Sequence, residues 1–296
     1  MQKEDEEVLS HYSVLMSVYY KEKPQYLRES MLSMWNQTVK TDDFILVCDG
    51  PLTKELDDVI DDMKNIYGDV LHIYRLKKNS GLGNALNEGL KHCENEFVAR
   101  MDSDDISRKD RCEKQLKLFE ANPEISLSSG TVSEFVSTPS NVIGKRVLPI
   151  SDAEIRKFSK KRNPMNHPCV MFRKTSVVKS GGYAEKYHLF EDYFLWIRLL
   201  MKNYKAENTS DVLLDMRTPT DIYKRRGGKK YAKDMLNFHR WMKSVGWSSQ
   251  IDFITGALPH AVVCILPNEV RKLIYDFDAK QGVILRSPAL RPSLID

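Results

Sequence analysis

The sequence lacks the features that mark several classes of protein. None of its apolar runs approaches the ~20 residues that a helix needs to cross a bilayer. Residues 1–7 are mostly acidic and form no apolar signal segment, so we expect a cytoplasmic protein. The five cysteines lie far apart and form no CxxC pair, which favours free thiols over a disulfide framework or a zinc site: Cys48, Cys93, Cys112, Cys169 and Cys264.

The charge balance gives no argument for a nucleic-acid partner. The 45 basic and 41 acidic residues leave a net charge of +4, which is too small for that purpose. Basic residues cluster at 157–162 and 224–230, where they suit phosphates or an anionic membrane surface, although most such runs are solvated faces. The 296 residues, 42% of them hydrophobic, can form one large or one-and-a-half soluble domains.

Strand-like apolar runs alternate with helix-like segments in the first hundred residues. The predicted strands are 12–19, 44–48, 70–74 and 97–101, and the helices between them begin at Pro24, at Leu52 and after Gly83. This order predicts a right-handed, mostly parallel α/β sheet of the nucleotide-binding type. Further along we expect helices at 111–119, from 151 and at 193–201, and strands at 126–135, 142–148 and 168–172.

Three carboxylates follow the predicted strand at 97–101: Asp102, Asp104 and Asp105. Acids crowded at a strand end repel one another unless a cation neutralises them. In open α/β sheets, ligands bind at the carboxyl ends of the strands. Two hypotheses follow: a divalent-metal site that handles a phosphorylated ligand, or a solvated acidic turn in which Asp105 or Ser107 caps the next helix.

Other phosphate-binding signatures are incomplete or absent. Gly81 and Gly83 follow the third predicted strand rather than the first, and Leu86 stands where a dinucleotide fingerprint needs its third glycine. The P-loop pattern is missing. A haloacid-dehalogenase-like phosphatase would use a pair such as Asp102 and Asp104, but after a first strand and followed by Gly-Thr, a pattern that this chain does not have.

Four segments, in the right order, resemble the inverting family 2 glycosyltransferases with a GT-A fold. The first is the opening strand and nucleotide loop at 13–22, in which Ser17 and Tyr20 replace the usual proline and asparagine. The others are the N-x-G-L and A-x-N-x-G helix at 79–89, the acidic motif at 100–105 with Arg111 and Gln115 after it, and the acceptor-side segment at 181–199. The resemblance covers residues 12–226.

This resemblance implies a metal-dependent enzyme. It makes Asp104 the main ligand of Mn²⁺ or Mg²⁺, with Asp102 reaching the ribose or, through water, the metal. It makes Asp192 the general base that accepts the proton of the attacking hydroxyl, with Glu191 beside it. The alternative for these last two acids is a favourable interaction with a helix dipole.

The resemblance also implies a donor pocket. Asp49 would accept a hydrogen bond from uracil N3; the alternative is a plain Asp-Gly turn. The further donor-binding candidates are Ser17, Tyr19, Glu22, Arg100, Asp102, His167, Arg225 and Arg226. The arginine pair suits the donor diphosphate or a lipid diphosphate. A structural imidazole at 167 and a solvated basic loop at 224–228 are the alternatives.

We expect a GT-A catalytic domain at 1–205, with a nucleotide-binding half at 12–110 and an acceptor half at 111–205. A basic loop and helical extension would follow at 206–285, and a structureless tail at 286–296. The almost entirely apolar stretch 253–266 follows a basic amphipathic segment. It would either lie in a membrane interface, which makes the protein peripheral to the membrane, or pack on the core or on a homodimer partner.

The implied reaction transfers a hexose from a UDP-sugar (UDP-Gal, UDP-Glc or an N-acetyl form) to a hydroxyl of a glycan linked to a lipid diphosphate. It would form a β-linkage during capsule or O-antigen synthesis at the inner face of the cytoplasmic membrane. One alternative is a sugar-phosphate nucleotidyltransferase, which needs a glycine-rich loop where residues 17–23 hold no glycine. The other is a non-catalytic module that binds sugars or lipids.

Overall fold

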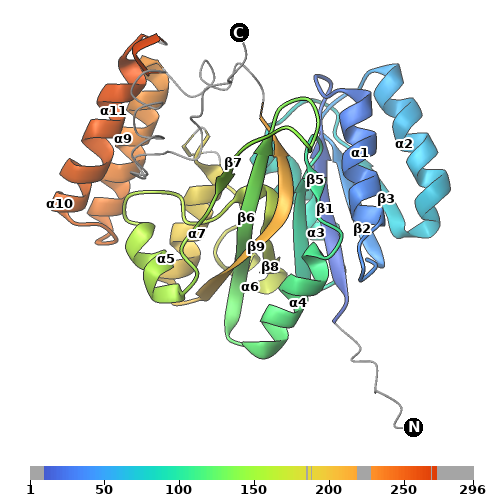
Figure 1. Cartoon of the computed structure of the whole chain (residues 1–296), viewed down its shortest axis with the longest axis horizontal. Helices are drawn as coiled ribbons and strands as arrows, with labels where there is room; N and C mark the ends of the chain where they lie inside the picture. The colour runs from blue at the N-terminus through green and yellow to red at the C-terminus, as the bar shows by residue number, and fades with distance from the viewer. Residues whose placement is uncertain (1–9, 185, 188, 219–227, 268, 272–296) are drawn as a thin grey trace.

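The computed structural model describes residues 10–184, 186–187, 189–218, 228–267 and 269–271. A nine-stranded sheet runs through the molecule in the order β3-β2-β1-β4-β8-β6-β9-β5, and β7 pairs with β6 (Figure 1). Arg225, Arg226 and the tail at 286–296 lie outside the described residues.

The amino-terminal half is the parallel α/β unit that the sequence predicts. Its strands are β1 (Tyr12–Val18), β2 (Asp43–Cys48), β3 (Leu71–Arg75) and β4 (Phe97–Asp102). All three strand pairs in this half are parallel. Strands β1 and β2 are almost completely buried because helices cover both faces of the sheet, which explains their uninterrupted apolar runs.

The helices form two layers with separate apolar cores. One face of the sheet packs against α1 (Pro24–Trp35), α2 (Lys54–Tyr67) and α4 (Arg111–Ala121). The other face packs against α3 (Leu82–His92), α5 (Asp152–Phe158), α6 (Lys174–Lys179) and α7 (Glu191–Met201). The helix predicted from residue 151 begins with the expected capping box, in which Ser151 and Glu154 bond each other's backbone.

The second half of the sheet is mixed. It contains β5 (Ile106–Ser107), β6 (Ile125–Phe135), β7 (Val142–Arg146), β8 (Met171–Arg173) and β9 (Lys205–Arg217). Strand β8 is antiparallel to both β4 and β6, whereas β9 is parallel to β6. The predicted strand 168–172 is shorter than expected, because residues 167–169 form a 3-10 turn around Pro168, which has no N–H to donate to a ladder.

Strand β9 is the main element that the sequence prediction missed. It pairs with β6 along most of its length, so the sheet extends to Arg217, past the boundary that we placed at 205. Its first residues, KAENTSD, are mainly polar, and its apolar run starts only at Val212. The usual strand signal is therefore missing from half of the element.

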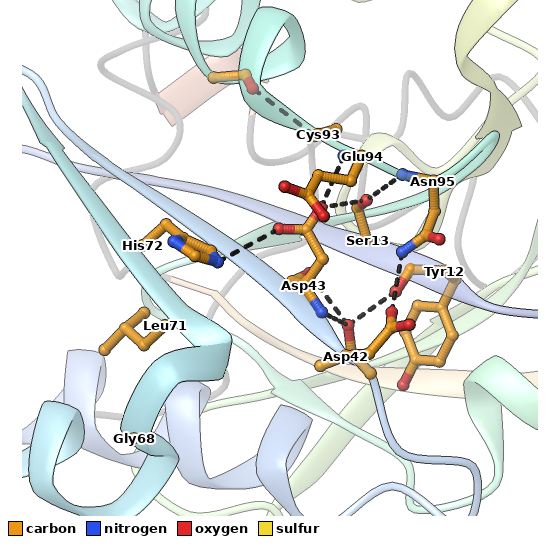
Figure 2. Close-up of polar contacts among 12 residues, drawn as sticks. Tyr12, Ser13, Asp42, Asp43, Gly68, Leu71, His72, Cys93, Glu94 and Asn95 are labelled. Carbon is orange, nitrogen blue, oxygen red and sulfur yellow. Dashed lines mark hydrogen bonds and ion pairs between the residues drawn. The ribbon is translucent and has the colours of Figure 1, made fainter.

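Asp43 ties three segments together at the end of the sheet where β1, β2 and β4 begin (Figure 2). Its Oδ2 accepts hydrogen bonds from Ser13 Oγ and from the Glu94 N–H, and Ser13 Oγ accepts one from the Asn95 N–H at 3.1 Å. His72 Nε2 lies 3.9 Å from Asp43 Oδ1. The turn between α3 and β4 is thus fixed to β1 and β2, at the end of the sheet away from the acidic motif.

The carboxyl-terminal part is a helical layer next to α7. It consists of α9 (Lys229–Ser244), α10 (Gln250–Asp252), a π-helical turn (Phe253–Ala257) and α11 (Leu258–Ile265). Phe238 and Trp241 of α9 pack on Tyr193 and Phe194 of α7, with ring centroids 4.7 and 4.5 Å apart. Figure 1 shows α11 lying alongside α9. No helix within the described residues is long and apolar enough to span a membrane.

Candidate active site

The acidic motif lies at the carboxyl end of β4. Asp102 ends the strand, Asp104 and Asp105 follow it, and one carboxylate oxygen of each lies within 4.8 Å of the others. Strand β1 lies alongside, with Ser17 directly opposite Asp102. The alternative in which Asp105 or Ser107 caps the next helix is wrong, because the N-cap of α4 is Asp110.

The three carboxylates have different neighbours. The buried Arg100 guanidinium donates from both terminal nitrogens to Asp102, with Nη1 2.6 Å from Oδ2. Asp105 is 2% exposed and accepts a hydrogen bond of 2.7 Å from the Arg217 N–H. Among the residues that the structure describes, no basic side chain forms an ion pair with Asp104. Asp104 is therefore the carboxylate that is most available to a ligand.

Electrostatics favour a cation at this cluster. Burial, reinforced by the charges of Asp102 and Glu22, raises the pKa of Asp104 to about 7. Burial and the charges of Asp104 and Asp102 raise the pKa of Asp105 well above its ordinary value. Carboxylate oxygens are the hard ligands that Mn²⁺ and Mg²⁺ prefer, so the donor set fits such an ion.

Arg217 holds the acidic turn in place from the end of β9. Its Nε donates to the Asp104 carbonyl oxygen at 3.0 Å, and its Nη2 donates to Glu29 at 2.7 Å. The guanidinium also lies 3.7 Å from the centroid of the Tyr26 ring. We assigned Arg217 no role from the sequence, because we did not predict the strand that carries it, β9.

The loop after β1 reaches the same turn. Glu22 Oε2 accepts a hydrogen bond of 2.7 Å from Ser103 Oγ, and the Glu22 N–H donates to the Tyr19 carbonyl at 3.0 Å. The structure thus brings Ser17 and Glu22 next to the acidic motif, and Tyr19 is bonded to Glu22 through its carbonyl.

Asp49 follows β2 and anchors the start of α3. Its Oδ1 accepts from the Ser80 N–H (2.7 Å) and Oγ (3.0 Å), and its Oδ2 accepts from the Gly81 N–H (3.0 Å). Gly50 is required beside it, because its φ is +90° and a Cβ there would lie 2.5 Å from the Asn79 nitrogen. The carboxylate is 3% exposed, so a uracil would have to share it with this loop.

Asn87 joins α3 to the acceptor-side segment. Its side-chain amide donates to the Tyr183 carbonyl (2.6 Å) and accepts from the Tyr183 N–H (2.8 Å). Gly182 has a φ of +59°, and a Cβ there would lie 2.5 Å from Asn87 Oδ1. Asn87 and Gly182 belong to two of the segments that resemble the family, 79–89 and 181–199, but we predicted no role for either residue from the sequence.

His167 lies in an aromatic cluster with Tyr183 and Trp196. Its Nε2 is 3.0 Å from Tyr183 Oη, and the imidazole and Trp196 rings are 5.9 Å apart. Burial, with a contribution from Arg100, lowers the pKa of His167 well below 6.5. The imidazole is therefore neutral near pH 7 and brings no positive charge to a diphosphate.

The candidate base lies in the first turn of α7. Asp192 Oδ2 accepts a hydrogen bond of 2.7 Å from the Asn163 side chain, whereas Glu191 Oε1 accepts one of 3.1 Å from the Leu189 N–H. Burial raises the pKa of Tyr183, and the charges of Asp192 and Asp102 both add to this effect. The nearby Arg100 guanidinium opposes this rise in the pKa of Tyr183.

Comparison with known proteins identifies the family. A family model described as "Glycosyl transferase family 2" matches residues 13–182, more than half of the chain. The chain belongs to glycosyl transferase family 2. This confirms the family that the motifs indicated and makes the protein a glycosyltransferase.

Two relatives in this family align along almost their whole length. The amylovoran biosynthesis glycosyltransferase AmsE of Erwinia amylovora is 37% identical over 91% of this chain and 99% of its own. The UDP-Gal:alpha-D-GlcNAc-diphosphoundecaprenol beta-1,3-galactosyltransferase of Escherichia coli is 38% identical over 89% of this chain and 94% of its own.

Two solved glycosyltransferase structures have a similar fold. The mannosyltransferase PcManGT of Pyrobaculum calidifontis, in complex with GDP-Man and Mn²⁺, is 17% identical and has a TM-score of 0.62 over 96% of this chain and 83% of its own. S. aureus TarS 1-349 with UDP-GlcNAc is 20% identical, with a TM-score of 0.54 over 77% of this chain and 67% of its own. The predicted GT-A fold is confirmed.

Proposed function

We propose that this family 2 glycosyltransferase transfers a hexose, with inversion, from a UDP-sugar to a hydroxyl of a glycan linked to a lipid diphosphate. The observation that carries the proposal is the cluster of Asp102, Asp104 and Asp105 at the end of β4, whose carboxylate oxygens lie within 4.8 Å of one another. The Escherichia coli relative is named for a transfer of this kind from UDP-Gal. We therefore propose UDP-Gal as the first donor to test and a surface polysaccharide as the product.

Asp104, supported by Asp102, would hold a divalent cation such as Mn²⁺ or Mg²⁺. Such an ion, when bound, neutralises the charge that develops on the departing diphosphate. The protein's own contribution is positional. Arg100 fixes Asp102 from two nitrogens, and Arg217 holds the backbone of the acidic turn. The structure of the mannosyltransferase PcManGT in complex with GDP-Man and Mn²⁺ is consistent with this choice of metal.

Asp192 would act as the general base. As the acceptor oxygen bonds to the anomeric carbon from the face opposite UDP, the bond from that carbon to the diphosphate breaks and UDP departs. The proton of the acceptor hydroxyl passes to Asp192. One displacement of this kind converts an α-linked donor into a β-linked product. Asn163 would orient the carboxylate through its 2.7 Å hydrogen bond.

The remaining donor contacts complete the proposal. Ser17, Tyr19 and Glu22 would line the nucleotide, and Asp49 would share its carboxylate between the 80–81 loop and the base. Arg225 and Arg226, which lie outside the described residues, would bind a diphosphate. A lipid-linked acceptor would bring the enzyme to the inner face of the cytoplasmic membrane.

Release of UDP from a panel of UDP-sugars, with and without Mn²⁺, tests this function. The acceptor is N-acetylglucosamine linked to a lipid diphosphate. We expect release that depends on both metal and acceptor with one donor, and loss of release in Asp104→Asn. Pyrophosphate release from UTP and a sugar phosphate would instead indicate a nucleotidyltransferase. Donor binding without any turnover would indicate a binding module.

A further inference from the structure

The α10–α11 segment exposes a continuous apolar stripe. Its members are spaced three or four residues apart, so that they share one helical face: Ile251, Ile254, Leu258, Val262 and Ile265. Ile251 is 70% exposed and Val262 56%. The adjacent face, with Ala257, Ala261 and Cys264, is buried. The two alternatives for stretch 253–266 are therefore compatible, because one face packs on the protein while the other faces outward.

The stripe contains no charge that would favour water. Residues 253–267 include no Asp, Glu, Lys or Arg, and the one titratable imidazole among them is His260. Burial, together with the nearby charge of Arg162, lowers the pKa of His260 to about 4. This imidazole is neutral at physiological pH. A contiguous apolar surface of this kind marks an interaction site more often than an isolated exposed side chain does.

Cations border the stripe at its amino-terminal end. The Lys161 stem lies against the π-helical turn, where a Cβ added to Gly256 would be 3.0 Å from Lys161 Cγ. Lys161 Nζ lies 3.7 Å from an Asp252 carboxylate oxygen and so offsets the charge of this acid. Lys243 Nζ lies 5.7 Å from the centroid of the Phe253 ring.

Cations border the carboxyl-terminal end as well. The Gly228 N–H donates to the Cys264 carbonyl at 2.8 Å, which brings the start of α9 to the end of α11. Lys229 and Lys230, the next two residues, are both exposed. An apolar stripe with basic residues at both ends is complementary to an anionic bilayer, where the chains meet the apolar side chains and the headgroups meet the cations.

We propose that the stripe formed by Ile251, Ile254, Leu258, Val262 and Ile265 docks on an anionic lipid bilayer and lies in its interface without crossing it. This deepens the proposed function and rests on it, because a lipid-linked acceptor is presented at such a surface. A second copy of the chain is a poorer occupant. A two-fold contact between stripes would bring their basic borders together.

The position of the stripe connects docking to catalysis. Helix α11 packs on α9, and α9 packs on α7 through the Phe238–Tyr193 contact. Helix α7 begins at Glu191 and Asp192, the candidate base. The docked surface is therefore joined to the base through two helix contacts, and it brings the acceptor side of the enzyme close to the bilayer.

Vesicle sedimentation of the full chain tests the proposal. The probes are vesicles of phosphatidylglycerol with phosphatidylethanolamine and, for comparison, vesicles of phosphatidylcholine alone. The test variant is Ile254→Ser/Val262→Ser. The control is Ile66→Ser/Val178→Ser, which removes two comparably exposed apolar side chains from α2 and α6. Thermal melting of each variant verifies that it folds.

We expect the parent and the control to bind anionic vesicles equally well. The test variant should bind these vesicles at least about tenfold more weakly. Neutral vesicles should bind less of each of the three proteins. UDP release with a water-soluble acceptor should be equal in all three proteins. Equal vesicle binding by the test variant and the control would overturn the proposal. So would a shift from dimer to monomer on gel filtration, confined to the test variant, without loss of vesicle binding.

The two proposals fail separately. Vesicle binding is measured without donor or metal, so its absence leaves UDP release intact. Conversely, a chain that binds vesicles but releases no UDP contradicts the proposed reaction and retains the docking surface.

Discussion

The buried guanidinium of Arg100 holds both carboxylate oxygens of Asp102, its neighbour two residues along β4. The two side chains share one face of the sheet, as residues i and i+2 of a strand do. This two-nitrogen contact, the Arg100–Asp102 fork, distinguishes Asp102 from the other two acids of the motif. Asp102 is fixed by a permanent cation, Asp105 is held by a backbone N–H, and Asp104 is available to a ligand.

Replacing Arg100 by lysine tests the fork. A lysine is a single point of charge and cannot bond both oxygens, so Asp102 loses its orientation. We expect the rate of UDP release to fall at least about tenfold and the free energy of unfolding to fall by about 1–3 kcal/mol. Urea denaturation and initial rates measure the two effects.

The control for this substitution is Arg108→Lys, because Arg108 is half-exposed and pairs with Asp215 through one nitrogen. It should change stability by less than about 1 kcal/mol. Parent-like turnover in Arg100→Lys would show that the fork has no part in catalysis.

The raised pKa of Asp104 predicts a metal effect that depends on pH. In the metal-free protein the folded-state pKa of about 7 exceeds the unfolded value of 3.8. The folded state therefore binds more protons than the unfolded state in this window, and stability falls as the pH rises through it. A cation that binds the ionised cluster competes with those protons, so Mn²⁺ should raise the melting temperature more at about pH 8 than at about pH 5.5.

Melting curves with and without Mn²⁺ at the two pH values measure this effect. Asp104→Asn is the control, since the amide has no proton to lose and should remove most of the dependence on pH. Equal Mn²⁺ shifts at both values in the parent would contradict the assignment of Asp104 as a ligand.

The Asn87–Tyr183 bridge predicts a loss of both stability and turnover. In Asn87→Ala the N–H and C=O of the buried Tyr183 lose their partners, at a cost of about 1–3 kcal/mol in the free energy of unfolding. The bridge also holds the acceptor-side segment on α3, so UDP release should fall about tenfold or more.

The matched control on the same helix is Asn84→Ala. Asn84 is exposed and donates within its own chain segment to the Ser80 carbonyl. Its removal should change the free energy of unfolding by less than about 0.5 kcal/mol. A pair of variants with the same stability would show that the bridge contributes nothing to the fold.

Replacing Asp43 should lower stability without lowering turnover. Asp43→Asn turns an acceptor into a group that also donates, next to the Glu94 N–H, and should lower the free energy of unfolding by about 1–3 kcal/mol. Because the residue lies at the far end of the sheet from the acidic motif, kcat should stay unchanged below the melting transition. Asp42→Asn, at an exposed neighbouring position, is the control, and a selective loss of kcat in Asp43→Asn would contradict this account.

The parallel half of the fold could be predicted because its strands are buried on both faces. Continuous apolar runs such as Phe44–Cys48 are the direct consequence of that burial. The acidic motif was predictable for a related reason. Its acids follow a buried strand immediately, and the carboxyl end of a parallel strand is where ligands bind.

The rest depended on contacts between distant parts of the chain. Strand β9 is held by its pairing with β6, which no local pattern in its polar first half reveals. Arg217 could not be placed without that strand. The Asn87–Tyr183 bridge joins residues 96 positions apart, and only the fold brings them together. The Arg100–Asp102 pair is different, because its i, i+2 spacing places both side chains on one face of a strand without any distant contact, although we had not predicted it.

The configuration of the glycosidic bond in the product tests the central claim most directly. The parent, incubated with UDP-Gal, Mn²⁺ and N-acetylglucosamine linked to a lipid diphosphate, should form a product whose new linkage is β by NMR. Asp192→Asn should fold, bind UDP and lose turnover by about a hundredfold or more. An α-linkage, or full turnover in Asp192→Asn, would contradict an inverting displacement with Asp192 as the base.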